Sequence, residues 1–123
     1  MTDTEEIAAL KARMAKKRYF MMRRQVRDPS RIGLVLLAHY RWIIEMEKRD
    51  SILLSGPLSD RQGGAGVGMT ILRTETWEEA ERIAASDPFC TSGAMTFEIM
   101  AWQVNEGRLK LSVDLSDGTF HLA

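Results

Sequence analysis

Four stretches of the chain have the pattern of β-strands. Each is a short run rich in aromatic and apolar residues, followed by residues that favour turns. In this interpretation Ser55, Gly56 and Pro57 stop the second strand. The predicted strands cover residues 19–26, 52–54, 67–73 and 97–104.

Apolar residues also recur at helical spacing in two longer segments. The pattern predicts one helix from about Ile32 to Arg49. A second helix is expected to begin at Trp77, because Thr76 and Glu79 have the spacing of a capping box. It must stop near Asp87, since the following proline disfavours helical geometry in the residue before it. A further short helix, capped by an Asp or Thr at position 3 or 4, is expected near the start of the chain.

The order of the core elements is strand, helix, strand, strand, helix, strand, which is typical of the split βαβ arrangement of ferredoxin-like α+β folds. We expect this domain to span residues 17–107, with an N-terminal helical extension over residues 1–16. Residues 108–123 are expected to form a C-terminal β-hairpin extension, turning at Asp117 and Gly118 as a two-residue loop.

Both faces of the predicted sheet carry large apolar side chains. In the last core strand Phe97 and Ile99 lie on one face, whereas Met100 and Trp102 lie on the other. Two helices cover only one face of such a sheet, so a second copy of the chain is expected to cover the other, giving a homodimer of the dimeric α+β barrel type. The alternative is that the C-terminal strands supply part of this cover.

Composition narrows the functional classes. The chain has 123 residues with 17 basic and 17 acidic side chains, and the balance argues against a dedicated nucleic-acid-binding protein. A single cysteine, Cys90, excludes an internal disulfide, and no Cys or His pair has the spacing of a zinc site. The longest apolar run, residues 34–38, is too short to cross a bilayer. We expect a cytoplasmic protein without metal or cofactor.

The balanced total hides an uneven distribution of charge. Residues 1–31 carry nine basic and four acidic side chains, and the remainder carries eight and thirteen. The basic segment is either a solvated surface or a site that attracts an anion. Arg24 lies in a group of arginines that directly precedes the helix bearing His39, so we place it among the candidate substrate-binding residues.

His39 and Asp87 are the candidate acid–base residues. His39 lies in the middle of the predicted apolar face of its helix, where a histidine is either a hydrogen-bonded core residue or a catalyst. Asp87 is expected at the C-terminal end of a helix, where a negative side chain is unfavourable and needs a compensating partner. It is alternatively a simple Asp-Pro turn. Both helices lie on one sheet face in this fold, so the two side chains can meet.

Ser55 and Gly56 are expected to end a central strand, where a hydroxyl and backbone amides could hold a polar ligand group; a plain turn is the alternative. Ser55 is not in the G-x-S-x-G motif of serine hydrolases, which argues against serine hydrolysis. Cys90 is interpreted as a small packed residue; the alternative is a reactive thiol, which would require a stabilised thiolate.

Taken together, these motifs resemble the YciI-like (YCII-related) family. The matching features are residues 39–42 (His-Tyr-Arg-Trp), Ser55-Gly56-Pro57, Asp87-Pro88-Phe89, Gly93 and Trp102. The resemblance implies a dimeric ferredoxin-like fold with a cleft centred on His39 and Asp87, and one branch of the family contains a dehydrochlorinase of chlorinated hydroxyhydroquinones. Phe89 and Trp102 then join Ser55, Gly56 and Arg24 as candidate substrate-binding residues.

We therefore expect a cofactor-independent enzyme of lyase, isomerase or dehydrochlorinase type that acts on a small molecule, an anionic metabolite of aromatic degradation. A non-catalytic ligand-binding or regulatory dimer using the same cleft is the alternative, and a cofactor-free oxygenase is a third possibility.

Overall fold

The computed structural model describes residues 1–64 and 66–123. They form two compact units, one of residues Arg18–Gln103 and one that combines Met1–Lys17 with Val104–Ala123. The sequence from residue 59 to residue 66 is polar and glycine-rich, as in a hairpin loop, and one of its positions, residue 65, lies outside the described residues. Among the residues described, no helix has both the length and the apolar character that crossing a membrane requires.

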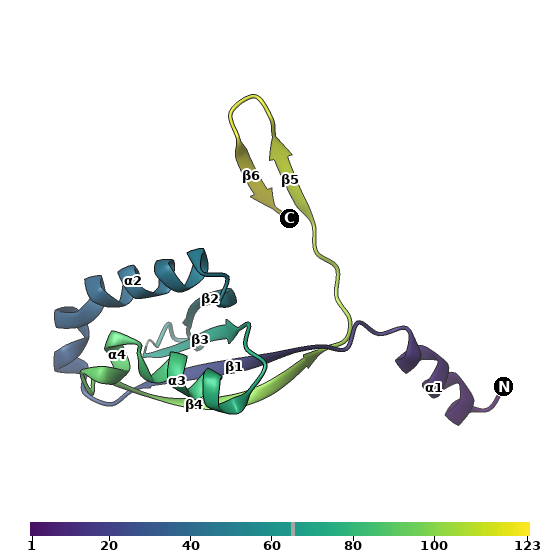
Figure 1. The fold of residues 1–123 in the computed structure, drawn as a ribbon, viewed down its shortest axis with the longest axis horizontal. Helices are drawn as coiled ribbons and strands as arrows, with labels where there is room; N and C mark the ends of the chain where they lie inside the picture. The colour runs from purple at the N-terminus through teal and green to yellow at the C-terminus, as the bar shows by residue number, and fades with distance from the viewer. Residues whose placement is uncertain (65) are drawn as a thin grey trace. The chain divides into compact units, whose positions relative to one another are not determined.

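The larger unit is an α+β structure with the element order predicted from the sequence. Its four-stranded sheet has the order β2-β3-β1-β4, with β3 antiparallel to both β1 and β2, so the ferredoxin-like class is confirmed. Figure 1 shows helices α2 and α3 over the same face of this sheet. The elements are β1 (Lys17–Val26), α2 (Ile32–Lys48), β2 (Ile52–Leu58), β3 (Val67–Leu72), α3 (Trp77–Ala85), α4 (Pro88–Thr91) and β4 (Met95–Val104), with a short 3-10 turn at Pro29–Arg31.

The core lies between the sheet and the helices. Phe20 and Met22 alternate along β1 and are fully buried, and they pack with Leu72 of β3 and with Ala80 and Ala84 of α3. Small alanines on the inner face of α3 let the helix approach the sheet closely, while Thr76 caps its first turn by accepting from the amide of Glu79, as predicted.

Helix α2 confirms the predicted boundaries but buries a narrower face than its pattern indicates. His39, Trp42 and Met46 are buried, whereas Leu36 and Tyr40 are exposed. The reason is that Leu36 and Tyr40 line a cavity, described below, which leaves their side chains accessible.

Two local predictions about the core unit are wrong. Strand β2 does not stop at Ser55 but continues through Gly56 and Pro57 to Leu58. It is also an edge strand rather than a central one, and an edge strand tolerates proline because the missing N–H can face away from the neighbouring strand. In addition, the pattern of residues did not indicate α4, a single turn that begins at Pro88.

The smaller unit contains helix α1 (Asp3–Ala12) and the hairpin β5 (Leu111–Asp114) and β6 (Thr119–Leu122). Thr2, rather than residue 3 or 4, caps α1. The hairpin loop has four residues instead of two, because Asp114 pairs with Thr119. Gly118 has a φ of +72°, which favours glycine, and its amide donates to the Asp114 carbonyl. No described residue of α1, β5 or β6 is buried.

Candidate active site

A cavity of about 510 Å³ opens between helices α2 and α4 and strands β1 to β3. Its volume is in the range of small-molecule sites. Four of the predicted site residues line it together with His39, namely Arg24, Ser55, Gly56 and Phe89. The fold thus brings together residues from four separate elements.

Asp87 lies behind His39 and is fully buried. The sequence interpretation placed it at the unfavourable end of a helix, but α3 already ends at Ala85. Asp87 instead caps the first turn of α4, where its Oδ1 accepts from the amide of Phe89 at 3.0 Å. This position is favourable for a carboxylate, because the amides of a helix N-terminus carry partial positive charge.

The same carboxylate binds both His39 and Arg24. Oδ1 lies 2.8 Å from His39 Nδ1, and Oδ2 accepts from Arg24 Nε at 2.6 Å. Burial alone would raise the pKa of Asp87, but the hydrogen bond from His39 and the charge and hydrogen bond of Arg24 outweigh it and lower the pKa below the usual value. Asp87 is therefore ionised at neutral pH and can only accept, so Nδ1 of His39 carries a proton, and in the neutral form of the imidazole the lone pair is on Nε2.

Aromatic contacts hold the imidazole in this orientation. The ring of His39 stacks on Phe89 with centroids 4.0 Å apart and planes 21° apart. Trp42, one turn along α2, is fixed in turn because its Nε1 donates to Ser86 Oγ at 2.9 Å. His39 is thus held at one nitrogen and at one ring face, which restricts its rotation.

Arg24 extends the network to the sheet. Its Nη1 donates to Thr70 Oγ1 at 2.7 Å, and Thr70 Oγ1 lies 2.7 Å from Ser55 Oγ. A continuous chain of hydrogen bonds therefore runs from His39 through Asp87, Arg24 and Thr70 to Ser55. Sequence reasoning missed Thr70, although a fully buried threonine in an otherwise apolar strand needs a polar partner.

The remaining candidates lie elsewhere. Trp102 is 43% exposed and is not among the residues that line the cavity; it alternates along β4 with Phe97 and Ile99, which pack against the core. Arg31, another arginine of the group that precedes α2, forms a salt bridge with Asp28 at 3.1 Å. Only Arg24 of the predicted arginine group lines the cavity.

Cys90 is not an activated nucleophile. Burial, together with the nearby charge of Asp87, raises the pKa of its thiol to about 12. The thiol therefore stays protonated at neutral pH, in agreement with its interpretation as a packing residue.

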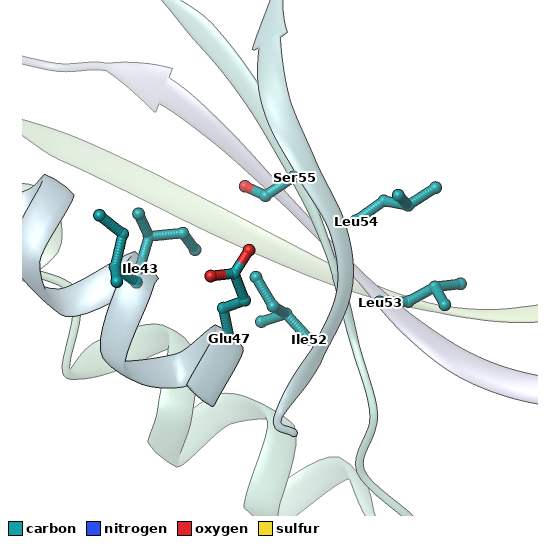
Figure 2. Close-up of a pocket in the computed structure, with 7 residues that line it drawn as sticks. Ile43, Glu47, Ile52, Leu53, Leu54 and Ser55 are labelled. Atoms are coloured by element: carbon teal, nitrogen blue, oxygen red, sulfur yellow. The ribbon is translucent and has the colours of Figure 1, made fainter. Parts of the chain in front are cut away.

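A second, smaller cavity of about 300 Å³ lies between the end of α2 and β2. Figure 2 shows Ile52 and Ser55 pointing toward α2, while Leu53 and Leu54 point away from it. Ser55 lines both cavities. The smaller cavity holds one carboxylate, that of Glu47, which is largely exposed, and no described cation binds it more closely than Lys48 at 3.7 Å.

Known proteins are similar to this chain at the level of a family model, of a curated sequence and of a solved structure. A family model described as "YCII-related domain" matches residues 18–103. The uncharacterized protein YjpA of Bacillus subtilis is 29% identical over 68 residues, which cover 55% of this chain and 75% of YjpA.

The solved structure of 5-chloro-2-hydroxyhydroquinone dehydrochlorinase (TftG) from Burkholderia phenoliruptrix, in complex with 2,5-dihydroxybenzoquinone, is similar with a TM-score of 0.56. The similarity covers 68% of this chain and 92% of TftG at 20% identity, so it supports the fold.

Proposed function

The chain belongs to the family of YCII-related domains, and on that premise we propose that it is a cofactor-independent enzyme that moves a proton on a small ring-containing substrate. The reaction is an elimination or isomerisation in which His39 is the acid–base catalyst. The observation that carries this proposal is the buried 2.8 Å contact between His39 Nδ1 and Asp87 at the wall of the cavity.

The proposed step follows from the assignment of protons in the site. Nε2 of His39 removes a proton from the substrate, and the electron pair of the broken bond forms a new double bond. In an elimination the leaving group, such as chloride, departs with its own electron pair. The imidazolium that results is stabilised by Asp87, which stays ionised, and it returns its proton to water or to the product.

The proposed substrate class is inferred from the residues that line the cavity and from the similar structure of TftG. The walls combine apolar side chains, among them Leu36, Ile43 and Phe89, with the hydroxyl of Ser55. These fit a hydroxylated ring, and TftG, which shares the fold, is a dehydrochlorinase of such a compound. We propose chlorinated hydroquinones as the first compounds to test.

The proposed enzyme is a homodimer that pairs the uncovered faces of two sheets. Leu54, Met100 and Trp102 are 60%, 57% and 43% exposed. They lie on the two edge strands β2 and β4, and large exposed apolar side chains of this kind are typical of an interaction surface. Light scattering that returns a stable monomer would contradict this part of the proposal.

The experiment compares His39→Asn with His121→Asn on a panel of chlorinated hydroquinones. An asparagine at this position can still donate to Asp87 but has no basic nitrogen, so chloride release should fall by about 10²–10⁴-fold. His121 lies on the exposed hairpin and serves as the matched control, with unchanged turnover expected. If His39→Asn alters ligand affinity and leaves turnover intact, the catalytic role is wrong.

A further inference from the structure

The guanidinium of Arg24 has one hydrogen-bonding position that the described residues leave open. Its Nε and Nη1 donate to Asp87 and Thr70, whereas Nη2 is buried without a partner among the residues that the structure describes. Arg24 is only 3% exposed and forms part of the cavity wall. An unpaired N–H of a buried cation is costly, and an oxygen acceptor in the cavity that Arg24 lines would satisfy it once the side chain shifts enough to expose Nη2.

The hydroxyl of Ser55 is a second donor in the hydrogen-bond chain that contains Arg24. The oxygen of Thr70 accepts from Arg24 Nη1, so the Thr70 hydroxyl is free to donate to Ser55 Oγ, which lies 2.7 Å away. In that orientation the Ser55 hydroxyl donates into the cavity that it lines. Arg24 and Ser55 then present two donors, a set that matches an anionic oxygen better than a neutral one.

The charges around His39 determine what such an anion would change. Arg24 from β1 and Asp87 ahead of α4 neutralise each other. Cys90 of α4 remains a neutral thiol, and the described aromatic rings near the imidazole are Tyr40 and Trp42 on its own helix and Phe89 on α4. With a neutral imidazole the described residues around it therefore carry no net charge, and a bound anion would leave one negative charge uncompensated in a largely buried site.

We propose that the cavity binds a single-ring organic monoanion through Arg24 and Ser55, and that His39 takes up a proton when the anion binds. This inference rests on the proposed function, because it names the substrate class of the same cavity. It also assigns Arg24 two tasks: it positions Asp87 through Nε and it binds the substrate oxygen through Nη2. The complex of the anion with protonated His39 has the same protonation as the site after His39 has removed a proton from a neutral substrate, so the anion mimics the product of the proposed first step.

The test is isothermal titration calorimetry of the full chain with benzoate and with benzamide, its neutral analogue. Benzoate should bind at least about tenfold more tightly, as expected for charge-assisted hydrogen bonds. Titration in phosphate and in Tris, which differ in ionisation enthalpy, should reveal net uptake of up to one proton per benzoate. The affinity for benzoate should accordingly fall as the pH rises.

Variants separate the two parts of the inference. His39→Asn should keep the preference for benzoate but lose proton uptake, and His121→Asn should behave as the wild type. Ser55→Ala should weaken benzoate more than benzamide. Arg24→Gln should abolish the preference, but it also removes a partner of Asp87, so the wild-type titrations decide if that variant does not fold.

Several outcomes would overturn the inference: no binding of benzoate, equal affinity for the two probes, benzoate binding without proton uptake, or uptake that persists in His39→Asn. These results are distinct from failure of the proposed function. Loss of turnover in His39→Asn together with equal affinity for both probes would reject only the anion site and would leave the proposed catalytic role intact. Proton-coupled benzoate binding in a protein without turnover would reject catalysis and retain the anion site.

Discussion

The chain contains two histidines, and each lies beside an aspartate. His39 Nδ1 and Asp87 are 2.8 Å apart in the core unit, while His121 Nε2 and Asp114 are 3.0 Å apart on the terminal hairpin. The two contacts are thus nearly equal in length. Their surroundings differ greatly, because the side-chain exposures are 11% and 0% for the first pair and 64% and 56% for the second.

The two pairs also differ in how many other groups hold them in place. Asp87 also accepts from Arg24 and from the amide of Phe89, and the imidazole of His39 stacks on a ring. Asp114 and His121 face water, where solvent and salt screen the interaction. Only the first pair therefore has a fixed proton position beside a cavity.

The largest difference between the two pairs should appear in stability. Asp87→Asn leaves the buried guanidinium of Arg24 without its counter-ion and should cost roughly 3–5 kcal/mol in the free energy of unfolding. Asp114→Asn, the matched change on the hairpin, should cost less than about 1 kcal/mol. Urea unfolding followed by tryptophan fluorescence measures both, and equal losses would show that burial does not distinguish the pairs.

Acidification should remove part of the stability that the ionised Asp87 carboxylate contributes. The pKa of Asp87 is lower in the folded protein than the ordinary value of 3.8, so its contribution to stability is complete above that pH. The contribution is lost as the pH falls below 3.8 and through the lowered pKa. The stability difference between wild type and Asp87→Asn should therefore shrink over this range in urea titrations at fixed pH steps. A difference that stays constant down to about pH 2 would contradict the role of the ionised carboxylate.

A smaller loss of stability is expected when the hydrogen bond between Trp42 and Ser86 is removed. Ser86→Ala leaves the indole N–H of the buried Trp42 without an acceptor and should destabilise the protein by about 1–2 kcal/mol. Thr119→Ala removes a comparable hydroxyl from the exposed hairpin, so its cost should stay within about 0.5 kcal/mol. Thermal unfolding of the two variants side by side tests this, and the reverse order would contradict it.

The smallest effect should come from the hairpin histidine itself. His121→Asn should change the free energy of unfolding by no more than about 0.5 kcal/mol, and roughly 1 M NaCl should remove even that change. Unfolding curves at low and high salt measure it. A large, salt-insensitive loss would mean that the hairpin pair is covered in solution.

Much of the core unit was predictable because its signals are local. The spacing of apolar residues predicted α2, the Thr76 box predicted the start of α3, and the order of elements predicted the sheet. The family resemblance is confirmed by the match over residues 18–103. The predicted second strand was shorter than β2, because serine, glycine and proline usually end strands. The edge position of β2 in the sheet permits them here.

The site was less accessible to sequence reasoning, because its contacts join residues far apart in the chain. His39 and Asp87 are 48 positions apart, and topology permitted their contact without requiring it. The arginine group indicated Arg24 by charge, but not its bond to Asp87, 63 positions away. Thr70 and Ser86 have no motif at all, and their importance follows only from what they touch.

Pro57 in β2 has a consequence for how molecules meet in solution. A bare sheet edge offers a row of donors and acceptors on which a foreign strand can build. Pro57 lies in the outermost strand, opposite Gly68, and it has no N–H to donate. The row is therefore interrupted in its second half, which protects this end of the sheet against open-ended polymerisation.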